Sequence, residues 1–370
     1  QKQIRRDSCA STFVQKRHKI HTPFVFKLIS FNKLVTGFVN IPVRTNIRPH
    51  TSEMDRVPVQ PKSYPTNLLQ KDWTKRAIYE RCGQAFVDKV HDMEVKDDDV
   101  WIVTLPKCGT TWMQELLWLV MNDFDFEAAR NEHLEVRTPF LEFDFLIHKD
   151  LNRALAPVEA LKSPRLIKSH MPLPLLPQQL WTKKPKLIYV YRNPKDYIVS
   201  RYYHVRSIGF GMSTTLEQFV LETLDEDADV PSEDFEHVAE FYELRNEPWI
   251  FYTSFERMKM NLRQVIEDIC KFLNKTITEQ QMEQMLKHLS FEEMKKNPKL
   301  NHHWEFEQIR AKHQTKHENH NFVRRGKAGG YKDELSSDII AKMDERIQQN
   351  LDYYKLSLQK LLLLDENTPL

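Results

Sequence analysis

The sequence predicts an α/β domain in which a central, mostly parallel β-sheet is flanked by helices. Short apolar runs bounded by polar or turn residues alternate with longer amphipathic stretches. This alternation is typical of strands and crossover helices in a parallel sheet covered on both faces. Only eight of the 370 residues are glycine, and half of these fall in two loops, which concentrates the backbone freedom of glycine there.

The expected elements follow from where the apolar runs begin and end. The expected strands are Val100–Leu105, Arg165–Lys168, Lys186–Tyr191 and Trp249–Thr253. The expected helices are Thr111–Asn122, Pro194–Arg206, Phe235–Leu244, Phe255–Leu273 and Ser336–Tyr354. Open parallel sheets bind ligands beyond the C-terminal ends of their strands. The loops after Leu105, Lys168 and Tyr191 are therefore expected to carry the chemistry.

The composition is that of a folded chain with an uneven charge. Hydrophobic residues make up 41%, charged residues 29%, and the net charge is +2. Residues 1–53 contain ten Lys or Arg but only two acidic residues. We expect residues 1–57 to be a basic N-terminal extension, either transit-like or an artefactual leader, and residues 58–370 to form one domain. The acidic balance of that domain disfavours nucleic acid as a partner.

Cysteine usage and hydropathy bear on location. The four cysteines are far apart and form no C-x-x-C pair: Cys9, Cys82, Cys108 and Cys270. This spacing favours free thiols in a reducing compartment. Residues 24–43 are the most apolar N-terminal stretch, but polar residues interrupt them, so they make a poor membrane span. We expect a cytoplasmic protein with no membrane contact.

The segment after the first strand has the composition of a phosphate-binding loop. A tight turn at glycine would point the first amides of the following helix at an anion. The threonines add hydroxyl donors, the lysine adds a charge, and the tryptophan offers a face for a base. The candidate residues are Lys107, Cys108, Gly109, Thr110, Thr111 and Trp112. A Walker A sequence is absent, which disfavours a magnesium-dependent nucleotide kinase.

Two further basic segments suit a phosphate group. Arg192 ends a strand, and Ser200 lies two turns into the next helix, close enough to share an anion with Arg192. Alone, this segment equally fits a helix with a charged first turn. Arg324, Arg325 and Gly326 form a second candidate, because arginine binds phosphate in a bidentate manner. Alone, that segment also fits a solvated basic loop.

Histidines occur in two settings. His170 follows Lys168 and Ser169 at the end of a strand, although a single histidine is more often structural than catalytic. Another group precedes the basic loop: His302, His303, His313, His317 and His320. Two of these have the i,i+4 spacing that zinc accepts. Because no cysteine or H-E-x-x-H pattern accompanies them, we expect a polar surface segment and no metal site.

Together these segments resemble the motifs of the cytosolic sulfotransferases, in that family's order, from about Trp73 to Met343. The first loop is similar to P-K-S-G-T-T-W, the second segment to Y-x-x-R-N-x-K-D-x-x-x-S, and the basic loop to R-K-G-x-x-G-D-W-K. The strand end at His170 is similar to K-[ST]-H-L-P. Ser290, Phe291 and Met294 resemble a T-S-F-x-x-M stretch, and Phe255 falls in a segment that ends Y-E-D-M in the family.

The resemblance implies an enzyme that moves a sulfuryl group from 3′-phosphoadenylyl sulfate (PAPS) to a small acceptor and releases 3′,5′-adenosine diphosphate (PAP), with no metal. His170 would remove the acceptor proton, and Lys107 and Lys168 would stabilise the developing charge. Ser200 would hold Lys107 until the acceptor binds. The 3′-phosphate would lie on Arg192, Ser200, Arg324, Arg325 and Gly326, and the adenine near Trp112, Phe255, Ser290, Phe291 and Met294.

Departures from the family pattern carry their own expectations. Cys108 replaces a serine, and beside Lys107 at a helix N-terminus its thiol pKa is expected to be lowered, so that its oxidation would block cofactor binding. Phe255 and Leu289 each replace a residue with a hydroxyl group, a loss of about 1 kcal/mol each in adenine binding.

The dimer motif K-x-x-x-T-V-x-x-x-E is absent, which leaves the oligomeric state open; the shortened region resembles invertebrate members. Aromatic residues in the expected acceptor loops favour an apolar phenol or sterol, although an amine is also open. Three alternatives remain: a nucleotide kinase, a Golgi carbohydrate sulfotransferase, and a nucleotide-gated binding protein without catalysis.

Overall fold

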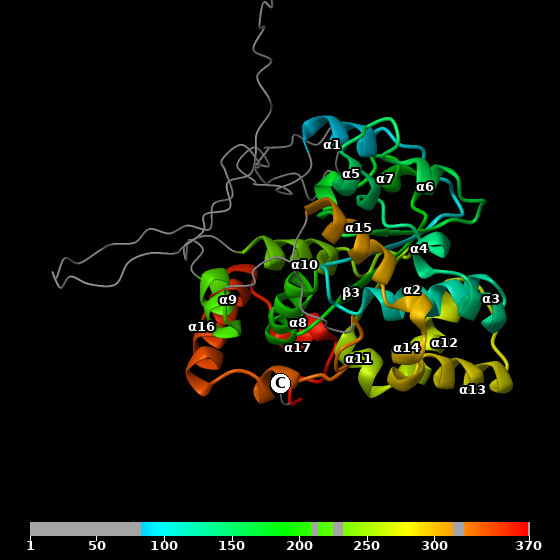
Figure 1. Ribbon diagram of the computed structural model, residues 1–370. Helices are drawn as coiled ribbons and strands as arrows, with labels where there is room; N and C mark the ends of the chain where they lie inside the picture. Colours follow the sequence, from blue (N-terminus) through cyan, green and yellow to red (C-terminus); the bar gives the residue numbers. More distant parts are fainter. Residues whose placement is uncertain (1–82, 209–213, 225–231, 314–321, 369–370) are drawn as a thin grey trace, which may run out of the picture. The chain divides into compact units, whose positions relative to one another are not determined.

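A four-stranded sheet lies at the centre of the computed structural model, which describes residues 83–208, 214–224, 232–313 and 322–368 (Figure 1). The strand order is β2-β1-β3-β4, and all three pairings are parallel. The strands are β1 (Val100–Thr104), β2 (Leu166–Ser169), β3 (Lys186–Tyr191) and β4 (Ile250–Ser254). The predicted parallel sheet is confirmed, with each strand displaced by at most one residue. The predicted boundary after residue 57 lies outside the described residues.

Both faces of the sheet are buried, because successive side chains of a strand point to opposite faces. Trp101 and Val103 of β1 belong to one hydrophobic cluster, and Val100 and Ile102 belong to the other. This is why β1 reads as an uninterrupted apolar run. The predicted arrangement of a sheet between two helical layers is confirmed.

The first cluster is covered by helices from both ends of the described chain. In Figure 1, α9 lies beside α16, and the two are in contact. The elements that contribute to this cluster are α1 (Gln84–His91), α5 (Phe143–His148), α6 (Ala156–Glu159), η3 (Leu173–Leu175), α7 (Leu180–Lys183), α8 (Pro194–Ser207), α9 (Leu216–Leu224), α10 (Glu233–Glu243), η5 (Gly330–Asp333), α16 (Ser337–Tyr354) and α17 (Leu358–Leu362).

The second cluster is covered by helices that include α2, which contacts α12; α13 packs on α12, and α14 contacts α13 (Figure 1). Its elements are α2 (Thr110–Met121), α3 (Phe126–Asn131), α4 (Leu134–Arg137), α11 (Phe255–Met260), α12 (Leu262–Phe272), α13 (Glu279–His288), α14 (Phe291–Lys296) and η4 (Pro298–Leu300). A further helix, α15 (His303–His313), contacts α5. Within the described ranges, no helix is both long and apolar enough to cross a membrane.

One predicted helix was wrong in extent. The stretch Phe255–Leu273 forms two helices, α11 and α12, that meet at Asn261. The Asn261 side chain accepts a hydrogen bond from the Gln264 amide at 3.1 Å, and asparagine is among the preferred residues at a helix N-cap. The capping side chain therefore starts a new helix inside a continuous amphipathic pattern.

Candidate active site

The loop between β1 and α2 turns sharply through two residues with left-handed backbone. The φ angles of Lys107 and Gly109 are 69° and 97°, and a Cβ on Gly109 would lie 3.0 Å from the ring of Phe255. Gly109 is the N-cap of α2 and offers no capping side chain. The first amides of this helix thus have the arrangement that attracts anions.

The hydroxyl and aromatic groups of this loop are held by specific neighbours. The Oγ1 atoms of Thr110 and Thr104 are 2.6 Å apart. Trp112 packs edge-on against Phe255, with ring centroids 5.7 Å apart. Its indole Nε1 is buried and has no hydrogen-bond partner among the described residues. A hydrogen-bond acceptor atom of a ligand would satisfy a buried donor of this kind.

The ammonium group of Lys107 lies 3.4 Å from the centre of the Phe322 ring. Burial, followed by the charges of Arg192 and Lys168, holds the pKa of Lys107 well below its ordinary value. A cation that is disfavoured by its surroundings gains most from an anion placed beside it. Lys107 is therefore suited to bind the charge of a phosphate or sulfuryl oxygen.

Cys108 corrects one expectation from the sequence. Its side chain is fully buried, and burial raises the pKa of its thiol, although the charge of Arg192 acts in the opposite direction. The predicted lowered pKa is wrong because the side chain lies in the hydrophobic core, where burial outweighs the nearby positive charge. A buried, protonated thiol is a poor target for oxidation, so the oxidation hypothesis loses its basis.

Arg192 connects the two predicted phosphate-binding segments. Its guanidinium donates to the Lys107 carbonyl at 3.3 Å and to the Lys327 carbonyl at 3.1 Å, and it lies 4.3 Å from the centre of the Phe255 ring. Its Nε is buried without a hydrogen-bond partner in the described part of the chain. Two segments that lie 85 and 135 residues from Arg192 in the sequence thus meet at its guanidinium.

Asp196, in the first turn of α8, anchors the basic loop. Its carboxylate accepts from the Gly329 amide at 2.6 Å and from the Tyr331 amide at 3.0 Å. No role for Asp196 was expected from the sequence. Its position in the first helical turn after Arg192 was the available signal, because a carboxylate there is suited to bind amides of a neighbouring loop.

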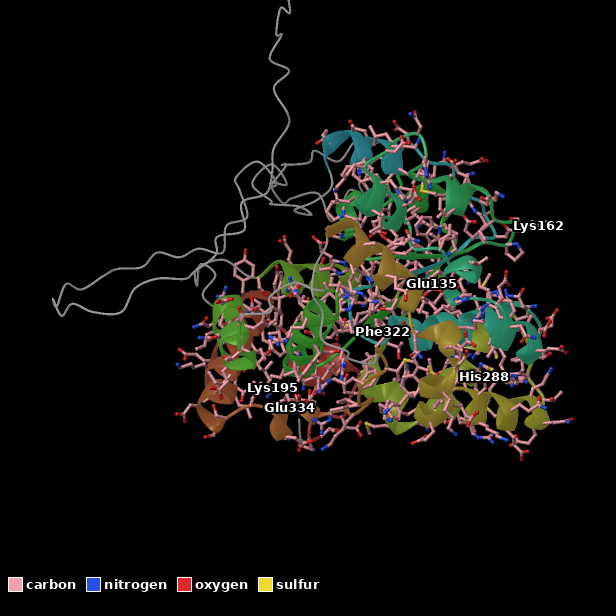
Figure 2. All side chains as sticks on the ribbon, viewed as in Figure 1. Glu135, Lys162, Lys195, His288, Phe322 and Glu334 are labelled. Atoms are coloured by element: carbon pink, nitrogen blue, oxygen red, sulfur yellow. The ribbon has the colours of Figure 1, made fainter. Side chains whose placement is uncertain are left out.

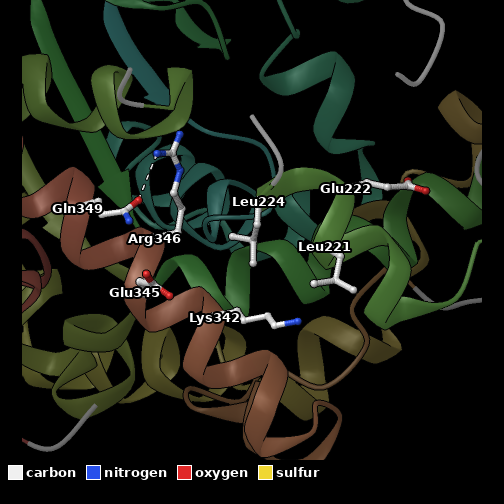
Figure 3. A pocket seen from close by; sticks show the side chains of 7 residues that line it. All are labelled: Leu221, Glu222, Leu224, Lys342, Glu345, Arg346 and Gln349. Carbon is white, nitrogen blue, oxygen red and sulfur yellow. Dashed lines mark hydrogen bonds between the residues drawn. The ribbon is translucent and has the colours of Figure 1, made fainter. Parts of the chain in front are cut away.

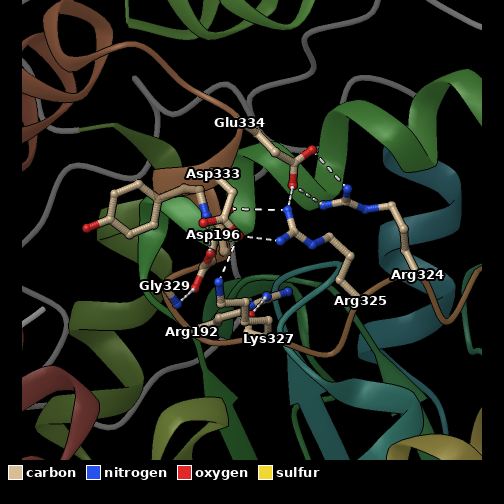
Figure 4. A network of polar contacts seen from close by, with 10 residues as sticks. Arg192, Asp196, Arg324, Arg325, Lys327, Gly329, Asp333 and Glu334 are labelled. Atoms are coloured by element: carbon tan, nitrogen blue, oxygen red, sulfur yellow. Dashed lines mark hydrogen bonds and ion pairs between the residues drawn. The ribbon is translucent and has the colours of Figure 1, made fainter.

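Arg324 and Arg325 share a carboxylate at this loop (Figure 4). Glu334 accepts two bonds from Arg324, both at 2.9 Å, and one from Arg325 at 2.7 Å. Arg325 and Lys327 also bind Asp333. Each guanidinium has five N–H donors, so these bonds orient both arginines and leave donors for a phosphate.

His170 is held in one tautomer by β1. Its Nδ1 is 2.7 Å from the Thr104 carbonyl oxygen, which only accepts, so Nδ1 carries the proton. Its Nε2 is therefore the basic nitrogen of the ring. Burial, followed by the charge of Lys168, holds the pKa of His170 well below its ordinary value, which favours the neutral imidazole.

Glu142 and Phe140 position the same histidine. The His170 amide and the Ser169 hydroxyl donate to Glu142 Oε1 at 2.7 and 3.1 Å. The Phe140 ring meets the imidazole edge-on at 4.9 Å, and the ammonium of Lys168 lies 4.3 Å from the centre of the same ring. The lysine and the histidine predicted from one sequence motif are thus brought to one aromatic side chain.

The remaining predicted residues occupy three places. Ser200 lies on α8 and is partly buried. Ser290 caps α14, accepting from the Glu293 amide at 3.3 Å, and Met294 is buried in the same helix. Phe291 faces the basic loop so closely that a Cβ on Gly326 would lie 2.3 Å from its ring.

The histidine-rich segment differs from its prediction at one residue. His302 is buried and lies 3.0 Å from Thr111 Oγ1 and 2.8 Å from a Glu135 carboxylate oxygen, so the surface location predicted for it is wrong. The side chains of His303 and His313, and residues His317 and His320, lie outside what the structure describes. Among the described residues no group of three or more His, Cys, Asp or Glu side chains is placed to hold a metal ion.

A hollow of about 450 Å³ on α9 and α16 shares no residue with these segments (Figure 3). Two apolar side chains and five polar or charged ones line it: Leu221, Leu224, Glu222, Lys342, Glu345, Arg346 and Gln349.

Comparisons with known proteins agree on one family. The family model described as "Sulfotransferase domain" matches residues 97–355. The luciferin sulfotransferase of Photinus pyralis is 36% identical over 281 residues, which cover 72% of this chain and 75% of that protein. The amine sulfotransferase of Oryctolagus cuniculus is 33% identical over 274 residues, which cover 73% and 86%.

Solved structures share the fold. Retinol dehydratase in complex with androsterone and inactive cofactor PAP matches with a TM-score of 0.64 and 25% identity, covering 76% of this chain and 88% of that one. A mouse sulfotransferase complexed with PAP matches with a TM-score of 0.56 and 20% identity, covering 75% and 94%. The second likeness concerns the fold alone.

The residues of this chain fit a nucleotide with two phosphate groups. Arg192 has a buried Nε and Trp112 a buried Nε1, neither with a partner within the described residues. Lys107 and Arg192 supply positive charge beside the N-terminus of α2. From the matched domain, the relatives and this fit, we conclude that the chain belongs to the sulfotransferase family and is a PAPS-dependent sulfotransferase of the cytosolic type.

Proposed function

We propose that the chain transfers a sulfuryl group from PAPS to the hydroxyl group of a small apolar acceptor, such as a phenol or a sterol, with His170 as general base. The observation that carries this proposal is the bond from His170 Nδ1 to the Thr104 carbonyl at 2.7 Å. It fixes the proton on Nδ1 and leaves Nε2 to accept one. A general base held in one tautomer is ready for proton transfer without reorganisation.

The Nε2 atom of His170 takes the proton from the hydroxyl group of the acceptor as the hydroxyl oxygen attacks sulfur. The new bond joins that oxygen to sulfur, and the bond from sulfur to the bridging 5′-phosphate oxygen breaks with its electron pair, which leaves with PAP. Such in-line transfer is catalysed mainly by positioning and charge stabilisation. The lowered pKa of His170 keeps the ring neutral before the step.

Two lysines stabilise the charge that develops in the transfer. Lys107 extends from the loop at the α2 N-terminus, and Lys168 from the end of β2. Both ammonium groups lie over aromatic rings, at 3.4 and 4.3 Å from the ring centres. Lys168 also acts electrostatically on the carboxylate of Glu142. We propose that Ser200 holds Lys107 before the acceptor binds.

We assign the two ends of the cofactor to the two loops. The 5′-phosphosulfate lies on the loop of Lys107, Cys108, Gly109, Thr110 and Thr111, where Cys108 contributes its backbone. The 3′-phosphate lies between Arg192, Ser200, Arg324, Arg325 and Gly326. The adenine lies near Trp112, Phe255, Ser290, Phe291 and Met294. The contacts of Arg192 with both loops support this assignment, because its guanidinium then lies between the two loops that hold the cofactor.

The acceptor side is aromatic. Phe140 touches His170 and lies 6.4 Å from Phe143, centre to centre. The solved retinol dehydratase holds androsterone, which supports an apolar acceptor here. We further propose a cytoplasmic protein, in keeping with the buried free thiols of Cys108 and Cys270, with residues 1–57 as an extension of one domain spanning residues 58–370.

Sulfate transfer from radiolabelled PAPS to a panel of phenols, sterols and amines tests the proposal. We expect labelled product with apolar hydroxyl acceptors, and less with amines. Transfer to amines alone would overturn the acceptor class. If PAP bound tightly but no member of the panel were sulfated, the acceptor would lie outside these three classes or the protein would be a nucleotide-gated binding protein, and the proposed acceptor class would be overturned.

A further inference from the structure

A buried chain of hydrogen bonds runs from Glu135 through His302 to the phosphate loop. Glu135 Oε1 is 2.8 Å from His302 Nδ1, and His302 Nε2 is 3.0 Å from Thr111 Oγ1. The His302 side chain is only 3% exposed. The three residues come from α4, from the turn before α15 and from the first turn of α2. The chemistry proposed above gives no role to Glu135 or His302.

The backbone and ring of His302 show that its position is closely determined. Its φ is 51°, a left-handed conformation that costs a non-glycine residue free energy and is kept where the surroundings hold it. Its ring packs against Phe322 with centroids 4.4 Å apart. Phe322, labelled in Figure 2, is the ring that receives the ammonium of Lys107. The chain of bonds thus borders the catalytic lysine as well as the loop.

The donors and acceptors along these hydrogen bonds determine how a proton on His302 affects Thr111. An ionised carboxylate only accepts, so the Nδ1 of His302 must donate to Glu135. A neutral imidazole then accepts at Nε2, and the hydroxyl hydrogen of Thr111 is used in that bond. A protonated imidazole donates at both nitrogens, and the hydroxyl hydrogen is free to donate to an anion in the loop. An anion there and a proton on His302 therefore favour each other.

We propose that Glu135 and His302 act as a proton-coupled relay that makes Thr111 a donor to the 5′-phosphate of the cofactor, so that nucleotide binding takes up a proton at His302. The inference rests on the cofactor site proposed above. His302 and Glu135 are then positioning residues, because they act through the hydroxyl group of Thr111.

The charges around the imidazole set the balance of this coupling. Glu135 favours protonation; burial acts to raise its pKa, but the hydrogen bond and charge of the imidazole outweigh burial and leave the pKa lowered. His133 lies 3.9 Å from the same carboxylate. His204 from α8 interacts electrostatically with the imidazole, but burial holds the pKa of His204 well below its ordinary value, so this ring is neutral. Lys107 and Lys168 act on the same group of residues. Positive charge on these lysines opposes protonation of His302, and a bound phosphate would offset it.

Calorimetric titration of PAP into the full chain measures the coupling, because repeating it in buffers of different ionisation enthalpy counts the protons taken up. The phosphates of PAP themselves titrate near pH 6, but they contribute equally in every variant. We expect His302→Gln to take up fewer protons than the parent chain. The affinity of the parent should fall relative to this variant by up to about tenfold per pH unit on the alkaline side, the limit for one linked proton.

Further variants separate the relay from a structural role. Glu135→Gln keeps an acceptor without the charge and should reduce the proton uptake. Thr111→Val should lower the uptake to the level of His302→Gln, and Thr111→Ser should keep the uptake of the parent. His91→Gln removes another buried histidine, whose Nε2 is 2.9 Å from the Pro174 carbonyl; it should lower stability and leave the uptake unchanged.

The same titrations distinguish two failures. Equal proton uptake in the parent, His302→Gln and Glu135→Gln chains, with PAP bound in each, would overturn the relay and leave the cofactor site standing. Absence of PAP binding to the folded parent chain would overturn the cofactor site, and the relay with it.

Discussion

Replacing Gly326 with alanine places a methyl group against the ring of Phe291. The added Cβ would lie 2.3 Å from Phe291 Cδ2 and 2.8 Å from Cε2, well inside contact distance, so the ring must move. Gly329→Ala is a matched control in the same loop. Gly326 and Gly329 have φ angles of 57° and 72°, but a Cβ on Gly329 would meet nothing within 4 Å.

The two substitutions should differ in size for this reason. In both variants alanine must adopt a left-handed backbone conformation, which lowers the unfolding free energy by roughly 1–2 kcal/mol. Gly326→Ala adds a steric conflict of about 1–3 kcal/mol. If the Phe291 ring moves to relieve it, a stacked adenine loses about 1–3 kcal/mol, which corresponds to a PAP affinity about 5- to 150-fold weaker.

Thermal unfolding and calorimetric PAP titration of both variants test these values. In a Phe291→Leu background the steric conflict is relieved, so Gly326→Ala should then cost no more stability than Gly329→Ala. Equal losses of stability and of PAP affinity in the two single variants would refute the role of the Phe291 contact.

Three further changes probe other parts of the site. Burial raises the pKa of Glu142 from 4.5 to about 7, so between these pH values the folded chain holds a proton that the unfolded chain releases, and the folded state loses stability as the pH rises. Urea unfolding from pH 4 to 8 should show Glu142→Gln gaining up to about 3 kcal/mol of unfolding free energy relative to the parent. A pH-independent difference between the two chains would contradict this. The Cys108 thiol should react with iodoacetamide only after unfolding in urea, and rapid labelling of the native chain would show that it is accessible. Asp196→Asn removes one of the two acceptor atoms that bind loop amides, so it should cost about 1–3 kcal/mol of stability and weaken PAP binding. The control Asp344→Asn changes an exposed carboxylate that pairs with Lys195 and should cost less than about 1 kcal/mol. Similar losses in both variants would argue against an anchoring role for Asp196.

The sheet was predictable from the sequence because each strand is an apolar run with clear ends. The order β2-β1-β3-β4 was not, since pairing between strands depends on packing of the whole sheet. The break at Asn261 carried a local signal, a capping residue, but the amphipathic pattern continues across it. Where two local signals compete, only the tertiary contacts decide between them.

The tight turn of the candidate phosphate loop was predictable because Gly109, one of only eight glycines, lies between a strand and a helix. Three features depended on contacts between distant segments. Cys108 points into the core, His302 is buried although its neighbours in sequence are polar, and Glu334 pairs with both arginines. Burial of a polar side chain is determined by what folds over it, so neither composition nor spacing indicates it.

The central claim is that His170 serves as the base and does not hold the nucleotide. Its most direct test measures, on the same His170→Ala preparation, sulfate transfer from labelled PAPS and calorimetric binding of PAP. We predict that transfer falls by about 100-fold or more while PAP affinity is unchanged. Transfer near the rate of the parent chain would contradict the account, and so would a loss of transfer that merely follows a loss of PAP binding.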